Sequence, residues 1–86
     1  MYLEILTPGN KIFAGDIKLL KVPGSMGSFE VLKNHAPIIS TLDDGNVKIV
    51  TKDNETLQYA INGGGGVIQV LKNNIIVLAE SFTKVS

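Results

Sequence analysis

The sequence predicts an all-β protein, folded as an antiparallel two-sheet β-sandwich of about eight to ten short strands. Between Thr56 and Ile61, large apolar residues alternate with small or polar ones, and a two-residue period places one side of a strand in a core. Clusters of Gly, Asn, Asp and Pro cut the chain about every eight to twelve residues, as in sandwiches and barrels. No long stretch keeps a helical period.

The first half of the chain contains two β-rich segments and one ambiguous segment. Residues 3–7, LEILT, and residues 11–22, KIFAGDIKLLKV, both favour strands. We expect a bend or bulge at residues 14–16, where Ala-Gly-Asp interrupts the second segment. Residues 29–42 come nearest to a helical pattern, but Pro37 interrupts them, so we predict no helix there.

The second half reads as strands separated by tight connections. Residues 43–46 and 72–74 favour turns, since Asn and Gly tolerate positive φ, and residues 52–55 favour a hairpin loop. Residues 75–79, IIVLA, are apolar at every position, which is typical of a strand covered on both faces. We therefore expect this strand to be central and buried.

Composition indicates one domain, residues 1–86, and excludes several kinds of site. Without cysteine there are no disulfides and no thiolate metal ligands. Eight lysines balance eight acidic residues and arginine is missing, which disfavours a nucleic-acid partner. No apolar run is long enough to span a membrane and no signal-type segment opens the chain, so we expect a cytoplasmic protein without membrane insertion.

Glycines 63–66 form the most unusual tract, which we expect to lie between two strands. A phosphate loop needs Lys and Ser or Thr directly after its glycines, at the start of a helix. Here Val67 and Ile68 follow, which favours a strand. The missing Cβ atoms more simply permit a bulge or a close backbone approach, and we favour that interpretation over nucleotide binding.

Three other features suggest chemistry weakly. His35 is the only histidine, and a general base needs a partner that the sequence does not identify, so we favour a turn residue that donates a hydrogen bond. Asp43 and Asp44 are neighbours, which suits a solvated turn better than an acid–base pair. Lys52 lies at a hairpin tip, as the modified lysine of a carrier domain does, but lacks the flanking residues of such domains. We predict no catalytic residue, no cofactor and no metal.

Four blocks share an order and spacing with a known family. They are TPGNKIFAG from Thr7, VPGSMGSFEVLKNHAP from Val22, NGG from Asn62 and NNIIVLAE from Asn73. Together they resemble the N-terminal β-sandwich of the epsilon subunit of bacterial F-type ATP synthase, called delta in mitochondria. Ser28 and Glu30 depart from the family, which often has Glu at the first of these positions and Gly at the second.

The resemblance implies a non-catalytic rotor subunit of the central stalk. It couples the membrane rotor ring of c subunits to the gamma subunit, at the cytoplasmic face of the bacterial inner membrane, and has no small-molecule substrate. By matched position, the resemblance implies two sets of interface residues. The ring-facing set is Gly24, Ser25, Met26, Gly27, Ser28 and Glu30, and the gamma-facing set is Thr7, His35, Ser40 and Asn62. Met26 and Phe29 are available as apolar anchors, and Phe29 is equally suited to the core.

Family members usually continue with a helical hairpin that inhibits ATP hydrolysis and in some members binds ATP. The sequence ends at Ser86, so we expect neither that hairpin nor nucleotide binding. Two alternatives stay open from the residues alone: a free-standing or carrier-type β-sandwich in another complex, and a small hydrolase built around His35.

Overall fold

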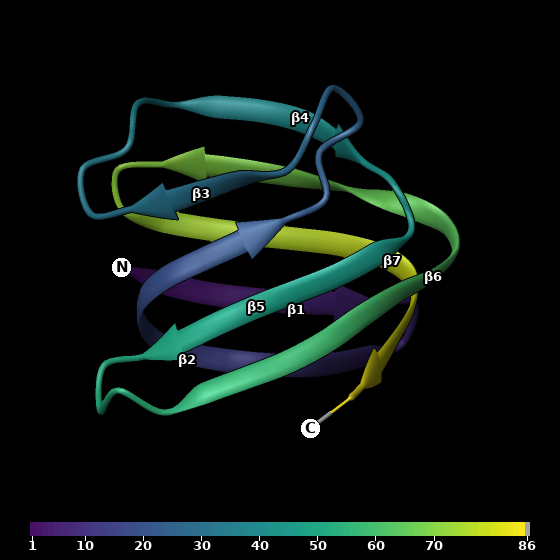
Figure 1. Ribbon diagram of the computed structural model, residues 1–86, viewed down its shortest axis with the longest axis horizontal. Coiled ribbons are helices and arrows are strands. Elements are labelled where there is room, and N and C mark those ends of the chain that lie inside the picture. Colours follow the sequence, from purple (N-terminus) through teal and green to yellow (C-terminus); the bar gives the residue numbers. More distant parts are fainter. Residues whose placement is uncertain (86) are drawn as a thin grey trace.

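The computed structural model describes residues 1–85, and these form strands and turns without a helix (Figure 1). The all-β prediction is therefore confirmed, but the number of strands is seven rather than eight to ten. They are β1 (Tyr2–Thr7), β2 (Asn10–Val22), β3 (Phe29–Leu32), β4 (Ile38–Leu42), β5 (Gly45–Thr51), β6 (Thr56–Leu71) and β7 (Asn74–Lys84). Within residues 1–85 there is accordingly no helix that could span a membrane.

Three long strands explain the lower number. β2, β6 and β7 have 13, 16 and 11 residues, and each continues past the point where the sequence suggests an interruption. β2 stays extended through residues 14–16, and its irregularities lie instead at Ile12 and Lys18, each left without a partner where the register shifts. A bulge bends a strand without ending it, so one long strand serves two layers.

The long bent strands join the two layers of the sandwich, so that five of the strands form a closed hydrogen-bonded cycle. β1, β7, β6, β5 and β2 are hydrogen-bonded in a cycle, because β1 pairs with both β7 and β2. β3 adds to β2, and β4 adds to β6. One layer holds β4, β1 and the adjoining halves of β6, β7 and β2; the other holds β3, β5 and the remaining halves (Figure 1).

The sheet is mixed, so the prediction of a strictly antiparallel sandwich is wrong. β1 runs parallel to β7, with Tyr2 opposite Asn74 and Leu6 opposite Leu78. All other pairings among residues 1–85 are antiparallel. The period of two residues identifies strands but carries no information on their direction, and the first and last strands meet only when the cycle closes.

The core lies between the layers and consists of inward side chains at alternate positions. The buried side chains of residues 1–85 are all apolar, and the largest with almost no exposure are Leu3, Ile5, Leu20, Ile49, Ile61, Ile68 and Ile75. Tyr59 and Ile61 are buried, as the alternation in β6 predicts. Phe29 packs against this core, so its aromatic ring stabilises the fold rather than standing free.

Most predicted turns are confirmed. Lys72 and Asn73 have φ of 51° and 62°, which matches a two-residue hairpin whose central residues both need positive φ. Asn54 has φ of 65° in the hairpin loop between β5 and β6. Residues 33–37 connect β3 to β4, and the segment 29–42 forms these two strands rather than a helix.

Candidate functional site

One outer face of the sandwich is apolar, although it is open to solvent. The face is formed by β1, β4, β7 and the half of β6 that follows the glycine tract. We call it the apolar face; its outward apolar residues are Leu6, Ile39, Val67, Leu71, Ile76 and Leu78. Ile39 is 76% exposed and Leu78 is 49% exposed, which are high values for large apolar side chains that share one sheet face.

Strand register aligns these residues in rows across the sheet. Leu6 lies opposite Leu78, Leu78 opposite Val67, and Val67 opposite Thr41. The adjacent row runs from Glu4 through Ile76 and Gln69 to Ile39. Directly opposed side chains in a sheet are close enough to touch, so Leu6, Leu78 and Val67 form one continuous apolar strip. The polar side chains of Glu4, Gln69 and Thr41 lie on the same face.

This face contradicts one sequence prediction and reveals a signal that was misread. Residues 75–79 were expected to be covered on both sides, yet Ile76 and Leu78 are 36% and 49% exposed while Ile75, Val77 and Ala79 are buried. The continuous apolar run therefore marks a strand with one side in the core and the other side open. A strand that is apolar on both sides is usually covered on both sides. Where one side is open instead, the exposed apolar surface is typical of a site that contacts another protein.

A groove of about 600 Å³ opens at one end of the apolar face, where β6 and β7 bend. Apolar side chains and glycine backbone provide most of its wall. The lining residues are Leu6, Thr7, Pro8, Gly64, Gly65, Gly66, Val67, Leu78, Ala79 and Glu80. Such a groove suits an apolar side chain of a partner protein.

The glycine tract forms the inner rim of this groove as a bulge within β6. Asn62 lies opposite Ser81 and Gly66 opposite Ala79, so three glycines of β6 face a single residue of β7. Gly63, Gly64 and Gly65 have φ of 81°, 115° and 78°, values that favour glycine. The predicted bulge is confirmed, although it lies inside one strand rather than between two.

The predicted close backbone approach is confirmed as well. A Cβ atom on Gly65 would collide with the carbonyl of Leu42, and one on Gly66 would collide with the carbonyl of Leu78. β6 therefore passes against its neighbours at a separation that only glycine permits.

The tract does hold an anion, and the anion belongs to the protein. The Asp44 carboxylate accepts hydrogen bonds from the backbone N–H groups of Gly64 and Gly65, at 3.0 Å and 2.6 Å. Successive N–H groups that converge on one oxygen form a concave anion site. Sequence reasoning placed Asp44 in a solvated turn and missed this contact, since it joins residues 20 and 21 positions apart.

Four of the six residues predicted to face the ring, Ser25, Met26, Gly27 and Ser28, form an exposed loop between β2 and β3. Gly24 at the start of this loop is buried, and Glu30 lies in β3. Met26 at its tip is fully exposed. Ser25 ties the loop to β4: its N–H donates to the Thr41 carbonyl at 3.0 Å, and its hydroxyl donates to Asp43 and accepts from Thr41. Gly27 donates its N–H to the Gly24 carbonyl at 2.9 Å and closes the loop.

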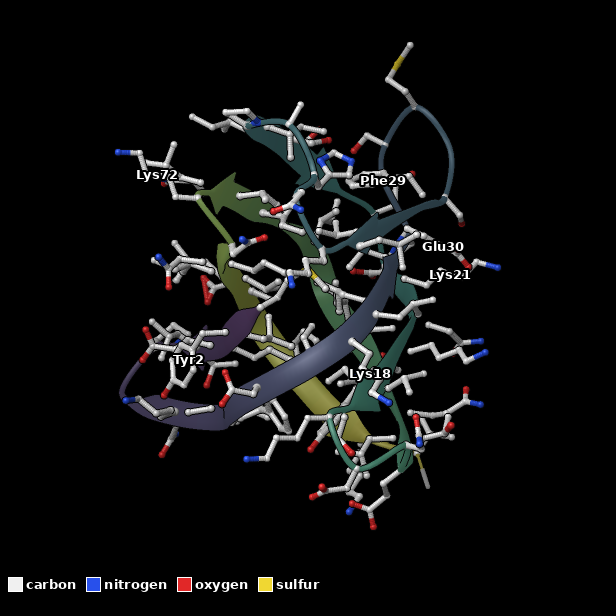
Figure 2. All side chains as sticks on the ribbon, turned by 90° about the vertical axis from the view of Figure 1, so that its left-hand side faces the viewer. Tyr2, Lys18, Lys21, Phe29, Glu30 and Lys72 are labelled. Atoms are coloured by element: carbon white, nitrogen blue, oxygen red, sulfur yellow. The ribbon has the colours of Figure 1, made fainter. Side chains whose placement is uncertain are left out.

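The same loop borders the opposite outer face, which we call the polar face. It is the outward side of β3, β5 and the adjoining halves of β2 and β6, and one row runs across it from Glu30 through Lys21 and Lys48 to Gln58. Figure 2 shows Glu30 beside Lys21, with Lys18 further along the same side. Ser28 borders a hollow of about 480 Å³ that Lys21 and Lys48 also line. Glu30 thus lies on this face and not in the loop.

The four residues predicted to face gamma do not form one cluster. Thr7 lines the apolar groove, and Asn62 precedes the glycine bulge, where its side chain donates to the Thr83 hydroxyl at 3.0 Å. Ser40 lies in β4 and donates to the Thr41 carbonyl at 3.0 Å. His35 lies beyond the far end of β4, in the connection to β3.

His35 occupies the kind of position predicted for it. Its Nδ1 lies 2.7 Å from the carbonyl oxygen of Ala36, and because a carbonyl only accepts, Nδ1 carries the proton and donates. Next to it, Asn34 and Asn73 exchange hydrogen bonds that join the β3–β4 connection to the β6–β7 turn. The histidine therefore belongs to a turn.

Residues 1–85 contain one ion pair. The Lys11 ammonium lies 3.1 Å from the Glu4 carboxylate, and this hydrogen-bonded ion pair raises the pKa of Lys11. Residues 1–85 contain no group of three His, Asp or Glu side chains placed to hold a metal ion. What the arrangement offers is shape: an apolar sheet face, a groove and an anchored loop.

These features define a class, a small β-sandwich with one open apolar sheet face. The chain belongs to the ATP synthase delta/epsilon chain β-sandwich domain family, whose pattern it matches over residues 1–85. The resemblance seen in the sequence is confirmed.

Known ATP synthase epsilon chains are similar along nearly the whole chain. The epsilon chain of Campylobacter hominis is 38% identical over 80 residues, 93% of this chain and 61% of its own length. That of Sulfurovum sp. is 42% identical over 77 residues, 90% of this chain and 60% of its own length. The Chlorobaculum tepidum epsilon chain is 39% identical over 80 residues, and the match covers 91% of this chain and 86% of that one. The chain thus spans about 60% of the first two relatives.

Two solved assemblies contain the same fold. A chain in the Euglena gracilis mitochondrial ATP synthase OSCP/F1/c-ring structure superposes with a TM-score of 0.85 at 16% identity, covering 95% of this chain and 51% of that one. A chain in the Tetrahymena thermophila mitochondrial ATP synthase central stalk/c-ring structure gives 0.75 at 17% identity, covering 95% and 64%.

Proposed function

We propose that this chain is a non-catalytic rotor subunit of the central stalk of an F-type ATP synthase, coupling the membrane rotor ring to the gamma subunit during ATP synthesis. Family membership supports this, as do the epsilon-chain relatives and the central-stalk assemblies that contain the fold. The single observation that carries the proposal is the apolar face, on which several large apolar side chains, among them Ile39 and Leu78, lie open to solvent.

Folding alone does not account for that face. The inward residues of β7 already supply the core, so the outward Ile76 and Leu78 contribute little to it. Burying them against a partner removes apolar area from water, at roughly 25 cal/mol per Å². We assign this face and its groove, with Thr7 at the rim, to the gamma subunit.

The anchored loop suits the second partner. Met26 projects fully exposed from a loop that Ser25 fixes to β4. We assign this loop, with Gly24, Gly27 and Ser28, to the polar loops of the c subunits, and Glu30 to the border of the same contact. His35, Ser40 and Asn62 stay assigned to gamma as secondary contacts, since they lie outside the groove.

A coupling subunit must not deform under torque. The cycle of hydrogen-bonded strands and the all-apolar core give this body few soft connections, because interiors are packed as tightly as organic crystals. We place the protein at the cytoplasmic face of the bacterial inner membrane, as a peripheral part of the complex and a single clamp domain.

Purified gamma subunit and detergent-solubilised c-ring test the proposal directly. We expect the chain to co-elute with gamma in size-exclusion chromatography and to bind the gamma–ring assembly more tightly than gamma alone. No nucleotide should be turned over by the chain itself. If the chain binds neither gamma nor the ring but binds another protein of the same cell, it belongs to a different complex and the proposal is wrong.

A further inference from the structure

The Asp44 carboxylate is the one side chain, among residues 1–85, whose recorded hydrogen bonds reach the backbone of the glycine bulge. It lies in the bend between β4 and β5, and the same oxygen accepts from Gly64 at 3.0 Å and Gly65 at 2.6 Å. The bend between β4 and β5 is thereby joined to the glycine bulge at the end of the apolar face.

These two hydrogen bonds, which we call the tie, stabilise a segment whose conformation is costly to form. Three consecutive residues with positive φ are all glycine, and glycine loses more conformational freedom on ordering than any other residue. Gly63–Gly65 also fall outside the ladder between β6 and β7, so the ladder does not hold these residues in place. A charged acceptor that binds two adjacent N–H groups compensates for both losses.

The position of the bulge shapes the groove. Gly64, Gly65 and Gly66 line it together with Val67 and Leu78, so any movement of the glycines changes the wall that an incoming side chain meets. Gly65 is packed against the Leu42 carbonyl, two residues before Asp44, so the segment that carries Asp44 is in direct contact with the groove wall.

We propose that Asp44 is a positioning residue for partner docking: its carboxylate holds Gly63–Gly65 in the conformation that keeps the apolar groove formed. The part of this inference that concerns docking rests on the proposed function. The part that concerns the bulge does not depend on any partner.

Hydrogen exchange of the Gly64 and Gly65 amides, followed by NMR on the chain alone, tests the tie. In Asp44→Ala we expect both amides to exchange at least about fivefold faster, because a hydrogen bond to a charged group is lost from each. Asp44→Asn keeps an oxygen acceptor without the charge, so it should fall between Asp44→Ala and the natural chain. Asp53→Ala, a carboxylate removed from the distant hairpin loop, is the matched control and should leave both amides unchanged.

Affinity for the gamma subunit tests the consequence. Asp44→Ala should weaken binding about fivefold or more, because the loosened groove wall must be ordered when gamma binds, and that ordering costs free energy. Asp44→Asn should recover part of the lost affinity. Unchanged exchange in Asp44→Ala overturns the tie. Faster exchange with unaltered affinity overturns the positioning role. If the natural chain does not bind gamma, the proposed function fails together with the docking role, while the exchange data still decide the tie.

Discussion

The two outer faces of the sandwich differ in chemistry although β6 runs through both. Before the glycine bulge, β6 presents Gln58 on the polar face; after it, the same strand presents Val67 and Leu71 on the apolar face. The inward residues do not change in character, since Ile61 and Ile68 are both buried. Folding requires only the inward pattern, so we attribute the difference between the outer faces to the proposed contact of the apolar face with gamma.

The glycine bulge separates the part of β6 on the polar face from the part on the apolar face. A substitution in it should have the largest effect on the free energy of unfolding. Gly65→Ala combines positive φ with a collision against the Leu42 carbonyl, so we expect about 3 kcal/mol of lost unfolding free energy. Gly9→Ala is the matched control, because Gly9 has the same φ of 78° but no atom within 4 Å of the added Cβ. Its loss should be about 1 kcal/mol. Urea unfolding of both variants measures the difference, and equal losses would show that the close approach costs nothing.

A charge placed on the apolar face should break the functional half of the comparison. We expect Leu78→Lys to weaken gamma binding by about 2 kcal/mol, roughly 30-fold, because Leu78 lies at the centre of an apolar row. The unfolding midpoint should move little, since half of this side chain is already in water. Gln58→Lys makes the same replacement on the polar face. Equal affinities of the two variants, in a titration with gamma, would remove the distinction between the faces.

On the polar face, an acidic residue in place of a lysine should stabilise the fold. Lys21 and Lys48 are directly opposite across β2 and β5, and like charges in that position are destabilising. Lys48→Glu replaces repulsion by attraction, so we expect a gain of about 0.3 kcal/mol that decreases with added salt. Lys52→Glu, in the hairpin loop, is the control for net charge. A loss of stability in Lys48→Glu would mean that the lysine pair has favourable contacts that the charge pattern does not explain.

The smallest effect concerns the ion pair that Glu4, at the end of one row of the apolar face, forms with Lys11. Glu4 raises the pKa of Lys11 above its ordinary value of 10.5, so the pair stabilises the fold fully below that pH and loses its contribution as pH rises through the pKa of the folded state. In Glu4→Gln the pKa of Lys11 should return towards 10.5, as NMR titration of the lysine Cε signal measures. An unchanged titration would mean that this exposed pair is not formed in solution.

Predictions from the sequence succeeded wherever a local signal was sufficient. Asn54 and Asn73 adopt positive φ because their own side chains and short connections favour it, and the turns follow. Tyr59 and Ile61 are buried because a two-residue period gives a strand one inner side. The order of short motifs was sufficient for the family. Assignments of Thr7, Met26 and the other interface residues stay predictions.

The failures share one cause, which is that they depend on neighbours distant in sequence. Ile76 and Leu78 were predicted to be buried because they belong to a continuous apolar run. The run does not reveal that the outer side of β7 is uncovered. The glycine tract looked like a break between strands because its partner residues are not adjacent in the chain.

The all-β character, the turns, the inward core and the family can be predicted from the residues alone, because each rests on backbone preferences or on residue order. Three features become visible only in the folded chain: β1 lies parallel to β7, Asp44 accepts hydrogen bonds from Gly64 and Gly65, and one sheet face stays apolar and open. These contacts form when the strand cycle closes, and closure depends on packing summed over the whole chain, which no local window of residues contains.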